Sequence, residues 1–298
     1  MSLFKVSARD FYICDRGFPH IKHERLDQFT ASVLGLGDLT APTREVDAIA
    51  AVFDLTGFTK FCTQIDPQLA ISEYLAAFLD WLFVTVKRES LVDESDPASS
   101  TSPERKRKAR GNRAPEEDGT VPMFATLPFF AKFVGDGVLF IWNASNLTEQ
   151  TICSVPAILM QVCASYELEF LPKIAFSVAD PPEMLRCGVA RGKVFSVGNG
   201  NDFVGPCINV ASRLQKLSAI QIAFSRRGFN ADKLMNSHMR SHFVLKKASI
   251  PGIGDNELVY ISKDDFDNLP PGGKAIFEEP DENWRVPTDE EIDALGKK

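Results

Sequence analysis

The chain has 298 residues, 44% of them hydrophobic and 24% charged, which is enough to bury one large core or two small ones. Its net charge of -7 argues against broad nucleic-acid binding, although a triphosphate needs only a local positive pocket. The longest apolar stretch, Tyr74 to Val86, is broken by Asp80 and is shorter than the ~18 to 20 residues of a membrane helix, and no secretion signal is visible, so we expect a cytoplasmic protein without membrane contact.

The first half of the chain predicts one strand and one long helix between less regular segments. Residues 1–45 mix aromatic and charged side chains and are interpreted as an N-terminal extension. The apolar run Asp47 to Leu55 predicts a buried strand, and the helical spacing of apolar residues from Pro67 to Lys87 predicts a core helix. Residues 90–120 are rich in Ser, Pro and charged residues and predict a flexible charged insertion.

The second half alternates strands and helices without a strict βαβ order. Gly135-Asp136-Gly137 separates two apolar runs and predicts a tight hairpin. The further elements that we expect are a helix over 148–169, a strand pair (184–190 and 194–197) that turns at Arg191-Gly192, a helix over 207–217, and strands near 221–225, 242–245 and 257–261. This order favours an α+β sandwich with a mixed, mainly antiparallel sheet, followed by an acidic C-terminal tail at 263–298.

Two aspartates are the first candidates for chemistry. Asp54 ends the first buried strand and Asp136 lies at the hairpin tip, so both carboxylates are expected at one edge of one sheet. An isolated aspartate before Thr-Gly-Phe is usually a helix cap. Paired carboxylates beside the backbone N–H groups of a helix start instead suit divalent metal and phosphate together. This pattern points to phosphoryl chemistry.

Other site classes have weaker support. The Gly-Lys pairs lack the Ser or Thr that a P-loop requires, and the glycines at 198, 200 and 205 do not have dinucleotide-binding spacing. The four histidines and six cysteines form no zinc pattern, and no nucleophile elbow is present. Zinc and serine-hydrolase functions are therefore disfavoured.

Four blocks of the sequence together resemble the class III adenylyl and guanylyl cyclases, in the order that this family has. The blocks are AVFDLTGFT (51–59), KFVGDGVLF (132–140), LRCGVARGKVFSVGNG (185–200) and NDFVGPCINVASRLQ (201–215). The resemblance covers residues 46–262 and implies a catalytic domain that converts a nucleoside triphosphate into a 3',5'-cyclic nucleotide and pyrophosphate. It further implies two Mg²⁺ or Mn²⁺ ions.

The resemblance assigns roles residue by residue. Metal ligands would be Asp54, Asp136 and the backbone carbonyl of Leu55, and the phosphate-binding residues would be Thr56, Gly57 and Phe58. Lys132 and Asp202 match the base-recognition positions of adenylyl cyclases. Asn209 matches the residue that orients the ribose, and Arg213 the residue that stabilises the transition state.

The family builds each active site across a head-to-tail dimer, so a homodimer is implied. One protomer would supply Asp54 and Asp136, and the other Lys132, Asp202, Asn209 and Arg213. The product would be read by a separate effector.

The chain departs from the family pattern in one phosphate contact. A lysine is usual near the final hairpin, but residues 249–260 contain none, and Lys246 or Lys247 is the nearest substitute.

Alternatives stay open for the base and for activity. Lys132 and Asp202 suit ATP, but a lysine donor and a carboxylate acceptor also match cytosine, and uracil with a shift of the backbone. The chain is similar in its free-standing architecture to bacterial pyrimidine cyclases of antiphage defence, which make cUMP or cCMP. A third hypothesis is a catalytically silent nucleotide-binding module, motivated by the missing lysine.

Overall fold

The computed structural model describes residues 11–13, 19–21, 38, 40–63, 67–91, 123–217, 219–229 and 242–281. Most of the predicted N-terminal extension, almost all of the charged insertion and the end of the acidic tail lie outside these ranges. The interpretations made for those segments therefore stay predictions.

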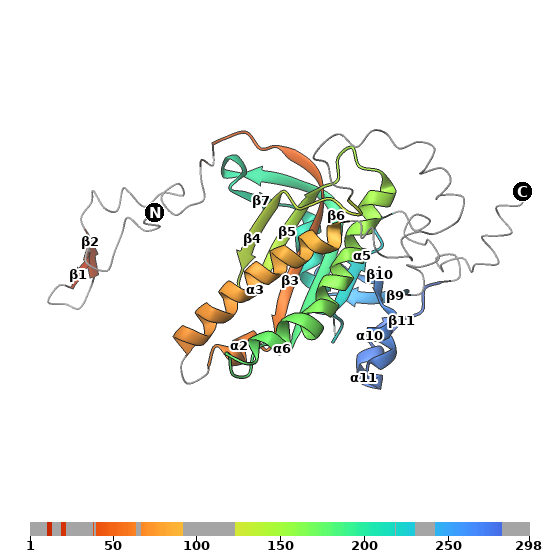
Figure 1. Cartoon of the computed structure of the whole chain (residues 1–298). Coiled ribbons are helices and arrows are strands. Elements are labelled where there is room, and N and C mark those ends of the chain that lie inside the picture. The colour runs from red at the N-terminus through yellow and green to blue at the C-terminus, as the bar shows by residue number, and fades with distance from the viewer. Residues whose placement is uncertain are drawn as a thin grey trace, which may run out of the picture.

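The described residues form a nine-stranded sheet and a separate two-stranded pair (Figure 1). The order in the large sheet is β11-β9-β10-β8-β6-β3-β5-β4, with β7 paired to β6, and only β6 and β8 run parallel. This mixed, mainly antiparallel sheet with helices confirms the predicted α+β class. The strands are β1 (Phe11–Ile13), β2 (Pro19–Ile21), β3 (Glu45–Thr56), β4 (Phe130–Val134), β5 (Gly137–Asn143), β6 (Met184–Val197), β7 (Asp202–Val204), β8 (Ile222–Ser225), β9 (Phe243–Ile250), β10 (Gly254–Ser262) and β11 (Phe277–Glu278).

Strand β3 lies inside the sheet, with β5 on one side and β6 on the other. Residues 48 to 55 of this strand are buried, as its apolar run predicted, because helices cover both faces of the sheet. Side chains alternate between the faces: Ile49, Ala51, Phe53 and Leu55 join the larger core, while Ala48, Ala50 and Val52 join a smaller core. Asp54 follows the second set.

The two faces carry different helices. Figure 1 shows α3 and α5 lying across one face of the sheet, where Phe78, Leu82 and Leu159 are fully buried in the larger core. On the other face, α7 contacts β6 and β3. The helices are α2 (Phe58–Phe61), α3 (Pro67–Ser90), α5 (Glu149–Ser165), α6 (Leu171–Ile174), α7 (Pro206–Leu214), α10 (Lys263–Asn268) and α11 (Pro271–Lys274), with the π-helix η3 (Tyr166–Phe170) and the 3-10 turn η4 (Gly198–Gly200).

Helix α5 continues directly into the π-helix η3 and then α6. The segment Glu149–Ile174 is long and apolar enough to cross a membrane, but 61% of its most apolar window is buried inside the fold. Its apolar composition is therefore explained by packing against the sheet.

The predicted turn at Arg191-Gly192 is wrong, because β6 runs without interruption from Met184 to Val197. Strand β3 is long enough to pair with β6 on both sides of this point, and Gly192 is opposite Ala48. Arg191 is held by ion pairs with Asp47 and Glu149, both at 2.9 Å. A Gly next to a charged residue suggested a loop, whereas the partner strand keeps the segment extended.

Ordered structure also continues past residue 262, where we expected the domain to end. Helices α10 and α11 follow at once, and β11 pairs with β9 at the edge of the sheet. Two apolar side chains of this segment, Leu269 and Phe277, are buried in a third core cluster, which also contains Val259 and Ile261 of β10. Residues 263–281 are thus part of the fold rather than a peripheral tail.

Candidate active site

Asp54 lies near the end of β3, and Asp136 lies in the turn between β4 and β5. Both are therefore at the same end of the sheet, where these strands end. In the β3–β5 ladder Asp54 is directly opposite Gly137, the residue after Asp136. A Cβ atom on Gly137 would lie 1.8 Å from the carbonyl oxygen of Phe53, so only glycine permits this approach of the two strands. The charge of Asp136 also reaches Cys62 after α2, where burial first and Asp136 second raise the thiol pKa.

Asp54 has a partner that the sequence analysis did not identify. The Arg186 guanidinium, on the neighbouring strand β6, donates through Nη2 to Asp54 Oδ2 at 2.5 Å. Asp54 is only 8% exposed, so its carboxylate is held by a nearly buried ion pair. Arg186 falls inside the third sequence block, but only the β3–β6 register shows that it is opposite Asp54.

Two buried polar atoms in and near this ion pair lack a hydrogen-bond partner among the described residues. Arg186 Nε and Thr56 Oγ1 are both buried, and neither has a hydrogen-bond partner among the described residues. Thr56 and Asp54 are two residues apart on one strand, so both side chains are directed to the face that α7 covers. Buried polar atoms without partners are uncommon and are expected where a polar ligand binds.

The acidic side chains at this end of the sheet are those of Asp54 and Asp136. No group of three or more His, Cys, Asp or Glu side chains that could hold a metal ion is found in the described ranges, at this site or elsewhere. The Thr56 carbonyl accepts from Glu183 on the β6 side, so the alternation of the ladder directs the Leu55 carbonyl to the β5 side, where Asp136 lies. Mg²⁺ prefers one or two carboxylates completed by waters and substrate phosphates.

Lys132 and Asp202 contact each other within one protomer. The Lys132 ammonium on β4 forms an ion pair with the Asp202 carboxylate on β7. The following residue, Phe203, donates its N–H to Asp202 Oδ1 at 2.9 Å, and its ring lies edge-on to Phe129 and Phe130, with ring centroids 5.4 and 4.9 Å away. The donor and the acceptor therefore lie on the two strands that carry Phe130 and Phe203. Phe129, Phe130 and Phe203 are called the aromatic cluster below.

Asn209 and Arg213 lie one turn apart on the exposed side of α7. The Arg213 guanidinium makes no ion pair within the described part of the chain. Helix α7 approaches β6 closely at Gly188, where a Cβ atom would lie 2.1 Å from the carbonyl oxygen of Ala211. The structure places these two side chains on the same face of the sheet as Asp54, since α7 covers that face.

The two lysines nearest to the missing phosphate contact, Lys246 and Lys247, both form ion pairs within the chain. Lys246 is buried, forms an ion pair with Glu279 and lies 4.3 Å from the centroid of the Phe266 ring. Lys247 is 3.7 Å from Glu278. The C-terminal segment that follows α11 supplies carboxylates to both lysines, and a role of either lysine in phosphate binding stays a prediction.

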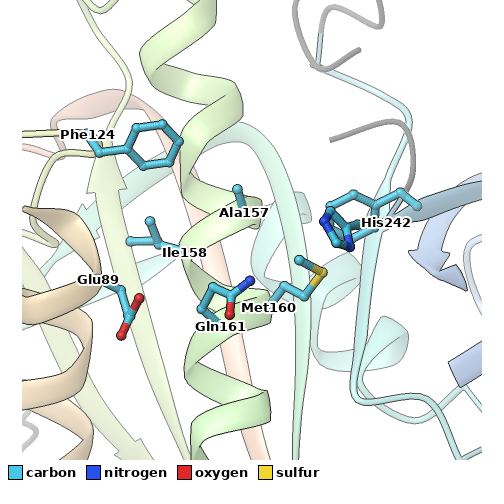
Figure 2. Close-up of a pocket in the computed structure, with 8 residues that line it drawn as sticks. Glu89, Phe124, Ala157, Ile158, Met160, Gln161 and His242 are labelled. Atoms are coloured by element: carbon cyan, nitrogen blue, oxygen red, sulfur yellow. The ribbon is translucent and has the colours of Figure 1, made fainter. Parts of the chain in front are cut away.

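Two cavities lie near these elements. One, of about 410 Å³, begins at Gly57 and continues past Lys60 and Phe61 to residues 180–183 and α6. The other, of about 200 Å³, lies between α3, α5 and the start of β9 and is mostly apolar (Figure 2). Figure 2 shows Glu89, Gln161 and His242 around apolar side chains such as Ile158 and Met160, and none of the predicted site residues lines this second cavity.

Solved structures with a similar fold include adenylyl and guanylyl cyclase domains. The adenylyl cyclase CyaB from P. aeruginosa is 14% identical over 77% of this chain and 100% of that chain, with a TM-score of 0.48. The guanylyl cyclase Cya2 is 14% identical over 74% of this chain and 92% of that chain, with a TM-score of 0.49. The guanylate cyclase domain of RhGC from Catenaria anguillulae, in complex with GTP, is 15% identical over 74% and 98%, with a TM-score of 0.41. No family model and no curated protein matches the chain.

Proposed function

We propose that the protein is a nucleotide cyclase that converts a nucleoside triphosphate into a 3',5'-cyclic nucleotide and pyrophosphate. The observation that carries this proposal is that Asp54, Asp136 and Arg186 lie at the same end of the sheet. The buried Thr56 hydroxyl, which has no hydrogen-bond partner among the described residues, follows Asp54 by two positions on β3. Two carboxylates and a cation around one small volume suit a metal-bound triphosphate.

The reaction joins the ribose 3'-oxygen to the α-phosphorus and breaks the bond from that phosphorus to the pyrophosphate oxygen. Asp54, Asp136 and the Leu55 carbonyl would hold two Mg²⁺ or Mn²⁺ ions, which supply Lewis acidity and charge neutralisation when bound. Arg186 keeps the Asp54 carboxylate oriented and adds positive charge beside it. Thr56, Gly57 and Phe58 would bind phosphate oxygens, Asn209 would orient the ribose, and Arg213 would stabilise charge in the transition state.

A homodimer would bring these groups together. Lys132 and Asp202 are already paired in one protomer, as the division of each site between two protomers requires. Apolar side chains on and beside the edge strand β4 are exposed, with Phe133 at 41%, Val134 at 37% and, on β7, Val204 at 53%. Exposed large apolar side chains are a feature of interaction surfaces, and we propose that Phe133 belongs to the dimer interface.

Phe133→Asp is expected to leave the protein monomeric and to abolish turnover, because a charge at the interface would have to be desolvated. Phe176→Asp is the matched control: Phe176 is 93% exposed in the turn after α6, so a charge there meets only water. Analytical ultracentrifugation with a parallel cyclase assay measures both variants. A dimeric Phe133→Asp protein would count against this interface.

The Lys132–Asp202 pair favours ATP as the substrate. The aromatic cluster is the observation that keeps a pyrimidine nucleotide as the second candidate. Phe203 follows Asp202 in β7 and packs edge-on against Phe129 and Phe130, and we propose that these rings leave room for a single-ring base. The product would then be cUMP or cCMP, read by a separate effector as in an antiphage defence system.

Incubation of the purified full chain with Mn²⁺ and equal amounts of ATP, GTP, CTP and UTP decides between these bases, with the cyclic products identified by mass spectrometry. Cyclic AMP would support the adenine assignment, and cUMP or cCMP would overturn it. EDTA should abolish the product. Absence of every cyclic product while nucleotide still binds would favour the silent binding module.

Arg213→Ala is expected to lower kcat by about 100-fold while dimerisation and melting temperature stay unchanged, because a cation that acts on developing charge affects rate more than ground-state binding. Arg226→Ala is a suitable control, since Arg226 donates to the Phe229 carbonyl and lies outside the proposed site. Unchanged turnover in Arg213→Ala would remove this residue from the mechanism.

A further inference from the structure

Two fully buried tyrosines, Tyr74 and Tyr166, form a hydrogen bond between their hydroxyl groups. Tyr74 of α3 and Tyr166, the first residue of the π-helix η3, have hydroxyl oxygens 2.7 Å apart, and both residues are 0% exposed. A buried hydroxyl must find hydrogen-bond partners, because water cannot replace them. The two tyrosines are therefore fixed relative to each other.

The direction of this hydrogen-bond chain follows from its end. Tyr166 donates its hydroxyl hydrogen to the carbonyl oxygen of Pro182 at 2.5 Å. Since each hydroxyl has a single hydrogen, Tyr74 must be the donor to Tyr166. The chain thus runs from Tyr74 through Tyr166 to the Pro182 carbonyl, and each bond polarises the next.

The chain continues through one peptide group. The Pro182 carbonyl and the Glu183 N–H belong to the same planar peptide, and the Glu183 N–H donates to the Thr56 carbonyl at 3.1 Å. A hydroxyl that holds the oxygen of this peptide therefore also fixes the direction of its N–H. Tyr166 in this way reaches the last residue of β3.

A second peptide brings the chain to the candidate phosphate loop. The Thr56 carbonyl and the Gly57 N–H again share one planar peptide, in which the two groups point in opposite directions. The carbonyl is directed to the β6 side by Glu183, so the Gly57 N–H is directed to the opposite side, where the Asp136 turn lies. Gly57 is one of the residues expected to bind phosphate.

Ring contacts also connect Tyr74 to helix α2, which directly follows Gly57. The Tyr74 ring centroid lies 5.1 Å from that of Phe61 and 6.4 Å from that of Phe58, so it packs against both aromatic residues of α2. Tyr74 and Tyr166 therefore hold the loop in two ways, through α2 by packing and through Pro182 by hydrogen bonds.

We infer that Tyr74 and Tyr166 are positioning residues that aim the Gly57 N–H at the triphosphate, an inference that rests on the proposed cyclase function. They touch neither substrate nor metal and act only through the two peptide groups and α2. Burial raises the pKa of both hydroxyls far above the physiological range, so both stay protonated and the chain keeps its donors at every working pH.

Three single-atom deletions in the full chain test this inference. Tyr166→Phe removes the donor to Pro182, and we expect the KM for the nucleotide to rise about tenfold, because a shift of the loop misplaces a phosphate donor. Tyr74→Phe leaves the bond to Pro182 in place and should raise KM less. Tyr260→Phe is the control: it removes the hydroxyl of a fully buried tyrosine on β10, which is separated from β3 by β8 and β6.

Melting temperatures separate a positioning role from a structural one. We expect Tyr74→Phe and Tyr166→Phe both to lower the melting temperature, because each breaks the Tyr74–Tyr166 hydrogen bond, while KM rises more in Tyr166→Phe. A KM that changes equally in both variants, or in neither, overturns the inference.

Hydrogen exchange tests the inference without turnover. In Tyr166→Phe the N–H of Glu183 and those of residues 56–58 should exchange faster than in the wild-type chain, and in Tyr260→Phe they should not. Unchanged exchange in Tyr166→Phe overturns the chain of bonds even if the wild type is active. A wild-type protein without cyclic product but with this exchange pattern would instead overturn the proposed function and leave the bonded chain established.

Discussion

Asp54→Asn should reduce cyclase turnover by about 1,000-fold, the largest effect on activity that we expect from one substitution. Asparagine keeps the shape of the side chain and can still accept from Arg186, but it loses the negative charge that a divalent ion requires. Loss of a metal ligand removes several kcal/mol of charge stabilisation from the transition state, and each ~1.4 kcal/mol corresponds to a factor of 10 in rate.

Asp47→Asn is the matched control for this experiment. Asp47 lies on the same strand β3 and is also paired with an arginine, Arg191, at 2.9 Å, but at the opposite end of the strand. Both substitutions remove one carboxylate charge from an ion pair, but Arg191 keeps its second partner, Glu149, so Asp47→Asn should lower the melting temperature less than Asp54→Asn does. Turnover should fall only in Asp54→Asn, and equal turnover in the two variants would contradict the metal-binding role.

Gly137→Ala is expected to lower the free energy of unfolding by about 3 kcal/mol, because the added methyl group overpacks a backbone contact. The Cβ atom would lie 1.8 Å from the Phe53 oxygen and 2.9 Å from its carbonyl carbon, and backbone atoms inside a sheet cannot move aside as a flexible side chain does. Strands β3 and β5 would have to separate where Asp54 and Asp136 meet, so metal-dependent activity should be lost as well.

Gly272→Ala provides the control, since no atom lies within 4 Å of a Cβ at that position in α11. There alanine should leave stability unchanged or raise it slightly, by less than about 1 kcal/mol, because it restricts the unfolded chain. Urea denaturation of both variants measures the difference. A Gly137→Ala protein as stable as the wild type would show that the two strands need not approach this closely.

Much of the fold was predictable because its signals are local. The apolar run before Asp54 predicted the buried strand β3, and the Gly-Asp-Gly sequence predicted the turn between β4 and β5. The spacing of apolar residues predicted the long helix α3. Each of these signals depends on periodicity or turn chemistry within a few residues, which neighbouring elements did not override.

Local signals failed where a partner strand decided the outcome. Arg191-Gly192 looks like a turn, yet pairing with β3 keeps β6 extended through it. The acidic segment after residue 262 looks peripheral, yet β11 pairs with β9 and brings Glu278 and Glu279 to Lys247 and Lys246. Neither result can be read from the segment itself, because the stabilising partners are distant in sequence.

The residues that we propose for the chemistry could be chosen from the sequence, because Asp54, Asp136, Lys132, Asp202, Asn209 and Arg213 all stand in blocks that can be recognised without coordinates. The contacts that support them depend on the tertiary structure. The β3–β6 register places Arg186 on Asp54, and the packing of α3 and the π-helix joins Tyr74 and Tyr166 to the loop at Gly57. Ion pairs and hydrogen-bond chains of this kind depend on distances between atoms far apart along the chain, and these distances are set by the packing of the whole sheet.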